Sequence, residues 1–177
     1  SHLPSIEAYK PIAEGGNVYS VGDTTKDPFP ERHVLHFRPE YFARMQADDR
    51  AVWSEFAQWL LGPNFLRFVL SKFEALVRQR FGDSLNAIDF QSSAQLLRDF
   101  TNYSLGPHSD HPSKVVVMIF YLPETDALKH LGTSIYLARN PEAHDDLGKH
   151  FDREHFYQAA TMPYKPNCAF GFFKTPI

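Results

Sequence analysis

The chain has 177 residues, which is the length of one ordinary domain. Apolar residues make up 43% of it and aromatic residues 15%, so a disordered or fibrous chain is excluded. Its 18 basic and 21 acidic side chains give a formal net charge of -3. That charge offers no basic surface for a nucleic acid or an anionic membrane, so we expect a small-molecule or peptidyl substrate as the partner.

Cysteine content and hydropathy bear on the compartment. The chain has one cysteine, Cys168, which excludes an internal disulfide and a cysteine-rich zinc site. Cys168 lies in an apolar run and is predicted to be a small buried residue. No apolar run approaches the roughly 20 residues that cross a bilayer. These features predict a soluble, cytoplasmic protein.

The first half of the chain reads as loops followed by helices. Prolines and glycines interrupt residues 1–40, which predicts loops and short edge strands. Apolar residues then recur at helical spacing in three stretches, residues 41–45, 49–61 and 65–77. Gly82 is well placed to cap the last helix. We expect Trp53, Trp59 and the phenylalanines of the helical stripe to be buried.

The second half reads as strands. Short runs rich in β-branched and aromatic residues occupy residues 94–100, 115–122, 133–137, 158–162 and 167–173. No helix separates them, which favours an antiparallel sandwich or barrel and an α+β fold. Residues 141–154 are polar and are predicted to form a long loop. The expected organisation is a single domain over 1–177, with loops and supporting helices in 1–85 and the β core in 86–177.

One histidine and one aspartate stand out between two predicted strands. Residues i and i+2 of an extended segment point to the same side, so His108 and Asp110 can converge on one metal ion. A second histidine from a distant strand would complete the 2-His-1-carboxylate face of a non-haem Fe(II) site. The alternative is an ordinary turn in which Asp110 caps backbone amides.

Two other histidines, His111 and His150, receive different interpretations. His111 is predicted to point away from Asp110, at the surface or in a supporting position. His150 and Asp152 repeat the His-x-Asp pattern inside the polar loop, where solvated surface is the expected role and a lid over the substrate is the alternative.

Three segments in the C-terminal half resemble one protein family. Residues 103–123 contain Gly-Pro-His-Ser-Asp-His-Pro-Ser-Lys and end in Phe-Tyr-Leu-Pro, residues 131–136 read Leu-Gly-Thr-Ser-Ile-Tyr, and residues 164–175 end in Phe-Phe-Lys-Thr. In this order they resemble three segments of the iron(II)- and 2-oxoglutarate-dependent oxygenases, in the prolyl-hydroxylase-like branch. These are the proximal metal segment, the Gly-Gly-Thr-x-Leu-Tyr strand and the strand that leads into the distal metal histidine. Leu131 departs from the glycine of the family pattern.

The resemblance implies a fold and an activity. The fold is a double-stranded β-helix, a jelly-roll or cupin-like antiparallel core with N-terminal packing helices. The activity is that of a dioxygenase, an oxidoreductase that hydroxylates a substrate with Fe(II), 2-oxoglutarate and O2 and releases succinate and CO2. His108 and Asp110 would be metal ligands. Tyr103 and Thr133 are candidate 2-oxoglutarate contacts because hydroxyls suit a carboxylate, with ordinary strand packing as the alternative. No catalytic residue beyond the metal ligands is predicted.

The family's third metal ligand has no counterpart in the chain. In relatives the distal histidine lies beyond the Lys-Thr pair that matches Lys174, and the residue that binds the far carboxylate of 2-oxoglutarate follows it. We therefore expect a jelly-roll that is incomplete at its C-terminus, with Lys174 at a solvent-facing strand end. The alternative function is a non-catalytic jelly-roll module that binds a small molecule or sugar. A zinc hydrolase is disfavoured because the chain has no His-Glu-x-x-His helix.

Overall fold

The protein is α+β and divides into two compact units. The computed structural model describes residues 3–15, 32–100, 105–140 and 151–174. One unit comprises residues 1–72 with 86–104, and the other comprises residues 73–85 with 105–177. This division differs from the expected boundary at residue 85, because the strand over residues 95–99 belongs with the N-terminal elements.

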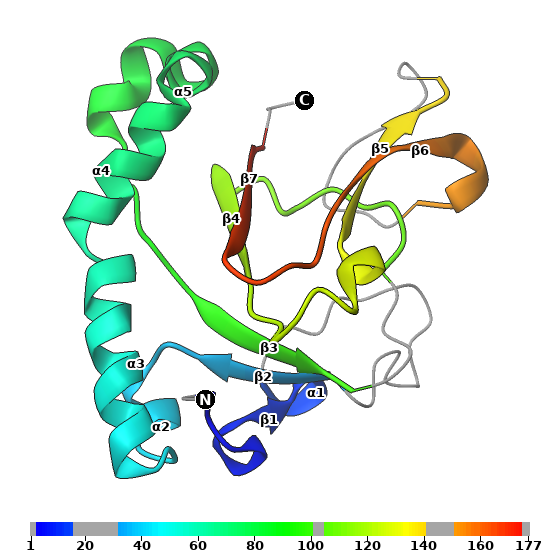
Figure 1. The fold of residues 1–177 in the computed structure, drawn as a ribbon. Coiled ribbons are helices and arrows are strands. Elements are labelled where there is room, and N and C mark those ends of the chain that lie inside the picture. Colours follow the sequence, from blue (N-terminus) through cyan, green and yellow to red (C-terminus); the bar gives the residue numbers. More distant parts are fainter. Residues whose placement is uncertain (1–2, 16–31, 101–104, 141–150, 175–177) are drawn as a thin grey trace. The chain divides into compact units, whose positions relative to one another are not determined.

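The first unit combines a three-stranded antiparallel sheet with helices (Figure 1). Its elements are β1 Lys10–Pro11, α1 Ile12–Gly15, β2 Arg32–His36, α2 Pro39–Phe42, α3 Ala47–Leu60, α4 Pro63–Lys72 and β3 Gln95–Asp99. The strand order is β1-β2-β3, with β2 in the centre. The predicted strand over 94–100 is therefore confirmed as β3, but it pairs with β2 from the N-terminal half of the chain.

The core of the first unit joins the sheet to helices α2 and α3. Leu35 of β2 and Leu96 of β3 are buried together with Tyr41 of α2 and Trp53 of α3. The predicted burial of Trp53 is confirmed. The predicted burial of Trp59 is wrong, since 54% of this residue is exposed. The buried stripe of α3 follows the spacing Trp53, Ala57 and Leu60, and Trp59 lies about 100° around the helix from Leu60.

The helix predicted over residues 65–77 is interrupted. Helix α4 ends at Lys72, and α5 runs over Glu74–Phe81. Between them Phe73 has φ -117° and ψ 19°, outside the helical region. Gly82 caps α5 as predicted: its φ is 50°, and its backbone N–H donates to the Arg78 carbonyl.

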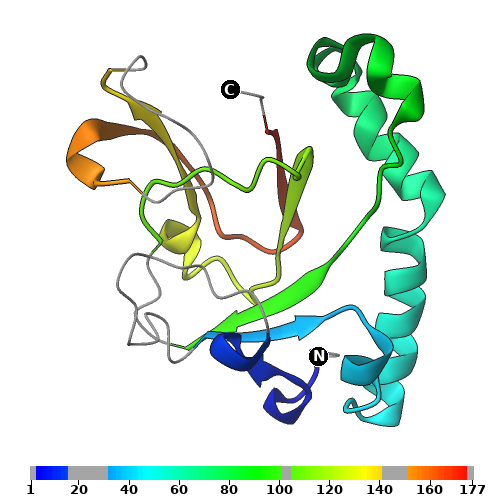
Figure 2. The same ribbon diagram turned by 180° about the vertical axis from the view of Figure 1, so that it is seen from behind.

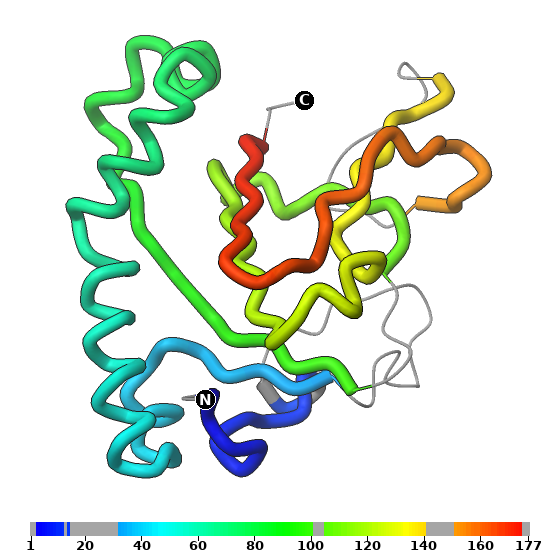
Figure 3. The backbone as a smooth tube through the Cα atoms, in the orientation of Figure 1, coloured from blue at the N-terminus to red at the C-terminus, as the bar shows by residue number. Residues whose placement is uncertain are grey.

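The second unit contains two antiparallel strand pairs and helix α5. Strand β4 Val116–Tyr121 pairs with β7 Cys168–Phe173, and β5 Thr133–Ala138 pairs with β6 Phe156–Met162. These strands lie within two residues of the predicted ranges. Along the chain, the β5–β6 pair is nested inside the β4–β7 pair (Figure 3). Figure 2 shows both pairs from behind.

Two contacts hold α5 against the β4–β7 pair. The ring of Phe73 stacks on that of Phe173 at 6.2 Å between centroids. The guanidinium of Arg80 donates to the main-chain carbonyls of Lys114, before β4, and Lys174, after β7. Separately, no helix in the part of the chain that the structure describes is long and apolar enough to cross a membrane.

Candidate metal-binding site

His108 lies in a segment that leads into β4, where it makes a single-residue β-bridge. Its side chain is exposed, and its Nδ1 is 3.0 Å from the carbonyl oxygen of Gly106. A carbonyl only accepts hydrogen bonds, so Nδ1 carries the proton and the lone pair of the neutral ring is on Nε2. Histidines that bind metals are oriented in this way, with the second ring nitrogen bonded to a carbonyl or carboxylate.

His111 has the opposite arrangement. Its Nδ1 accepts a hydrogen bond from the Ser113 backbone N–H at 3.2 Å and pairs with the Ser113 hydroxyl at 2.8 Å. The lone pair of the ring is therefore on Nδ1, where Ser113 uses it. The side chain is exposed, as predicted. His111 thus closes a surface turn, while His108 keeps the tautomer that suits a metal.

Asp110 is partly buried and ion-paired. Only 11% of its side chain is exposed, and its Oδ1 accepts a charge-assisted hydrogen bond from Nζ of Lys114. The turn alternative predicted that Asp110 would cap backbone amides, whereas Oδ1 pairs with the ammonium group of Lys114, four residues along the chain. One carboxylate oxygen is engaged by Lys114.

Arg80 anchors the turn that follows Asp110. Its Nη1 donates to the carbonyls of Lys114 at 2.8 Å and Lys174 at 2.7 Å, and its Nη2 donates to the carbonyl of Pro112. The guanidinium also lies 5.0 Å from the ring of Phe81 and 6.0 Å from that of Phe173. One side chain of α5 therefore fixes the turn at residues 112–114 to the end of β7. Sequence reasoning missed it, because an arginine off the apolar stripe of a helix reads as an ordinary surface charge.

Lys174 was expected at a solvent-facing strand end, but the structure buries it. Only 7% of the residue is exposed. Its N–H donates to the Val115 carbonyl at 2.9 Å, and its own carbonyl accepts from Arg80. These bonds extend the β4–β7 pairing by one residue, which holds Lys174 against the unit. Cys168, predicted to be buried, is half-buried in β7.

Thr133, a predicted 2-oxoglutarate contact, begins β5 and bonds to a buried tyrosine. The hydroxyl of Tyr121 donates to Thr133 Oγ1 at 2.7 Å and accepts from the Thr133 N–H at 3.2 Å. The ring of Tyr121 also packs edge-on against Tyr164 at 5.4 Å. Because Thr133 Oγ1 accepts this hydrogen bond, the Thr133 hydroxyl can donate a hydrogen bond to another group. Tyr103, the other candidate contact, lies outside the described residues.

Replacing Tyr121 by phenylalanine should lower the free energy of unfolding by about 1–3 kcal/mol. The substitution removes the hydrogen-bond partner of the half-buried Thr133 hydroxyl and of the Thr133 N–H. Urea denaturation measures the change. Tyr157→Phe is the matched control, since 46% of Tyr157 is exposed and its substitution should shift the free energy by less than about 0.5 kcal/mol. Equal effects of the two substitutions would contradict a structural role for the Tyr121 hydroxyl.

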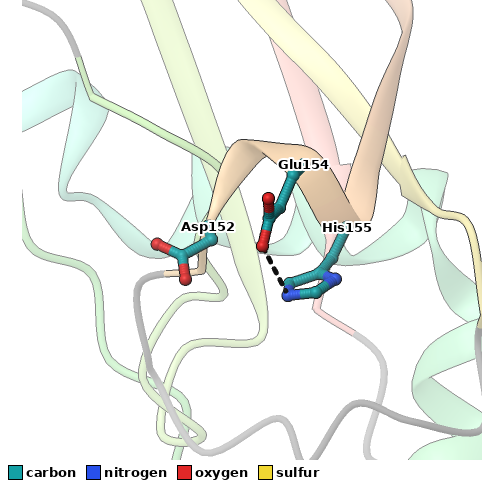
Figure 4. Close-up of side chains that lie close together, drawn as sticks. All are labelled: Asp152, Glu154 and His155. Carbon is teal, nitrogen blue, oxygen red and sulfur yellow. Dashed lines mark ion pairs between the residues drawn. The ribbon is translucent and has the colours of Figure 1, made fainter.

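A second group of possible ligands lies just before β6. Oxygen or nitrogen atoms of Asp152, Glu154 and His155 lie within 4.8 Å of one another (Figure 4). All three side chains are exposed, and His155 Nε2 is 3.5 Å from a carboxylate oxygen of Glu154. Exposure of Asp152 agrees with its predicted place on a solvated loop, while His150 lies outside the described residues. Acidic groups of this kind are common on protein surfaces without any ion.

The structure places His108, Asp110 and Thr133 in the second unit but joins them in separate hydrogen-bonded groups. His108 is bonded to Gly106, Asp110 to Lys114, and Thr133 to Tyr121. Within the described ranges, no third histidine, cysteine or carboxylate forms a ligand group with His108 and Asp110. No protein-family model matches the chain, and no curated protein and no solved structure shows a significant similarity to it.

Proposed function

We propose that the protein is an Fe(II)- and 2-oxoglutarate-dependent dioxygenase that hydroxylates a substrate. The observation that carries the proposal is the 3.0 Å contact between His108 Nδ1 and the Gly106 carbonyl oxygen, which favours the tautomer whose lone pair is on Nε2. Asp110, two residues on, supplies a carboxylate with one oxygen paired to Lys114. An imidazole nitrogen and a carboxylate oxygen are two of the three donors of a facial triad.

The strand pairing supports a double-stranded β-helix as the fold. A jelly-roll is a long antiparallel hairpin that is wound up, so its strand pairs are nested. The pairing of β5 with β6 inside that of β4 with β7 follows this order. In the proposed fold the His108–Asp110 segment enters β4, and β7 is the antiparallel partner of β4.

The residues would divide the work as follows. When bound, iron supplies the oxidising chemistry by which 2-oxoglutarate, O2 and a C–H bond become succinate, CO2 and a hydroxylated product. His108 and Asp110 hold the ion. The Thr133 hydroxyl, which accepts a hydrogen bond from Tyr121, would donate a hydrogen bond to a carboxylate of 2-oxoglutarate. Gly106 keeps the ring of His108 in the required tautomer.

The proposal is tested by metal binding and turnover in the full-length protein. We expect His108→Ala and Asp110→Ala each to weaken Fe(II) or Mn(II) binding by more than about 100-fold, since even the loss of an outer partner costs 10 to 100-fold, and to abolish succinate formation. The control combines Asp152→Ala with His155→Ala, which removes the exposed ligand group near β6. Turnover that survives loss of His108 or Asp110, or that is lost only in the control, would exclude this site.

The same experiment separates the alternative function. A non-catalytic jelly-roll module would bind a small acid or sugar without Fe(II) and would form no succinate. Its binding would be insensitive to Asp110→Ala. The metal motif does not identify the substrate class, because loops determine specificity in proteins of this architecture.

A further inference from the structure

We propose that a groove in the first unit binds a long-chain carboxylate, an anion with an extended apolar body. The groove has a volume of about 690 Å³ and is lined by residues of the segments 37–43 and 50–62. Volumes of this size are typical of small-molecule sites. All the lining residues belong to the first unit, whereas His108, Asp110 and Thr133 belong to the second, so the inference goes beyond the proposed function.

One wall of the groove is aromatic and is held by the core. Phe37 and Phe42 line it, and their ring centroids lie 5.7 Å apart. The ring of Phe37 also meets that of the buried Trp53 edge-on at 5.8 Å, and both phenylalanines pack against the core of the first unit. Because the core already fixes these rings, a ligand that lies on them orders few side chains.

Helix α3 forms the other wall over about three turns. Its lining residues recur at a spacing of three or four, namely Arg50, Ser54, Ala57, Gln58 and the C-cap Leu61. Residues at this spacing share one face of a helix. From the first of them to the last the helix rises roughly 16 Å. The groove is therefore elongated, which suits an extended chain.

The charge of the groove is positive. Its lining includes Arg38 and Arg50 and, among the described residues, no acidic side chain. Arg38 precedes α2, and Arg50 contacts the other end of that helix, where its Nη2 donates to the carbonyls of Met45 at 2.9 Å and Ala43 at 3.5 Å. Across the described ranges, no carboxylate forms an ion pair with either guanidinium. Both positive charges therefore complement an anionic head group.

The two walls and the two arginines together define the ligand class. A guanidinium binds a carboxylate through two parallel hydrogen bonds, which makes a carboxylate the matching head group. Each methylene group that leaves water for an apolar wall adds to the affinity. A neutral lipid lacks the head group, and a short acid lacks the chain. A long-chain carboxylate supplies both.

Titration of the full-length protein with laurate tests the inference, with two comparison ligands below their micellar concentrations. Octanoate has the same head group on a shorter chain and should bind at least about ten-fold more weakly. Dodecyltrimethylammonium has a chain of similar length with the opposite charge and should also bind at least about ten-fold more weakly. Amide chemical shifts should change on laurate binding within residues 37–43 and 50–62.

Two variants change the charge of the groove and keep its apolar walls. Arg38→Gln removes an exposed cation and should weaken laurate binding about five-fold. Gln58→Glu introduces a carboxylate of the same shape at an exposed position, so it should weaken laurate binding by about the same factor and tighten binding of dodecyltrimethylammonium. Arg67→Gln is the matched control, because Arg67 is an exposed arginine of the same unit that bonds to Asn64 outside the groove. It should leave laurate binding unchanged.

Three results would overturn the inference. They are equal affinity for laurate and dodecyltrimethylammonium, laurate binding that neither Arg38→Gln nor Gln58→Glu weakens, and amide shifts confined to the second unit. Absence of laurate binding would overturn it as well. The titration requires no metal ion, so its failure leaves the proposed metal site unaffected, and failure of the metal site leaves the groove unaffected.

Discussion

Replacement of Gly132 by alanine should lower the free energy of unfolding of the second unit by at least about 3 kcal/mol. A Cβ atom at this position would lie 1.6 Å from the Met162 carbonyl oxygen and 2.7 Å from its carbonyl carbon. It would also lie 3.0 Å from the Tyr164 backbone nitrogen. All three atoms are main chain, so no side-chain rotation relieves the clash, and the start of β5 must move away from the end of β6.

Hydrogen exchange measures this effect where it arises. In Gly132→Ala, the amides of the β5–β6 pair should exchange faster by a factor that corresponds to the lost stability. Leu131→Ala is the neighbouring control, since 60% of Leu131 is exposed, and it should change the exchange rates little. Normal protection of β5 and β6 in the glycine variant would show that this close approach is not required.

Arg80→Ala should destabilise the second unit by about 2–4 kcal/mol, because it leaves three main-chain carbonyls without a charged donor. These carbonyls belong to Pro112, Lys114 and Lys174. The variant also removes the cation from its positions over Phe81 and Phe173. Faster exchange should appear first around residues 111–115, where the turn loses its anchor.

The control for Arg80 comes from the same helix. Arg78 pairs with the exposed Glu74, so Arg78→Ala should change the free energy of unfolding by no more than about 0.5 kcal/mol. Arg80→Lys should recover only part of the stability, since an ammonium group cannot reproduce the planar fork of the guanidinium. Urea denaturation of the three variants measures the order. Equal losses from Arg78→Ala and Arg80→Ala would contradict the anchoring role.

The strands of the second unit could be predicted from the sequence because their pattern is local. Runs of β-branched and aromatic residues bounded by Gly, Pro and Asn placed β4 to β7 within two residues of their observed ends. The capping role of Gly82 was predicted for a similar reason, since a residue with φ of 50° at a helix end favours glycine. By contrast, the break at Phe73 carries no proline or glycine signal, and the stripe of apolar residues runs through it.

Which residues are buried was less predictable, because burial depends on partners that are distant in the chain. Trp59 and Trp53 are both among the apolar residues that predict helix α3, yet only Trp53 belongs to the buried core. Lys174 has a polar side chain at a strand end, yet only 7% of the residue is exposed, and its main chain bonds to Arg80 and Val115. Neither the exposure of Trp59 nor the burial of Lys174 could be predicted from the residues beside it in the sequence.

The sequence by itself determined the α+β class, the strands of the second unit and the pair of candidate ligands, His108 and Asp110, because spacing along an extended chain decides which side chains share a side. Only the tertiary structure decided which groups these two side chains contact. The tautomer of His108 follows from the Gly106 carbonyl, and the engagement of one Asp110 oxygen follows from Lys114. The anchor of that turn comes from Arg80, more than 30 residues away. Hydrogen-bond partners of this kind are chosen by packing, which the order of residues alone does not reveal.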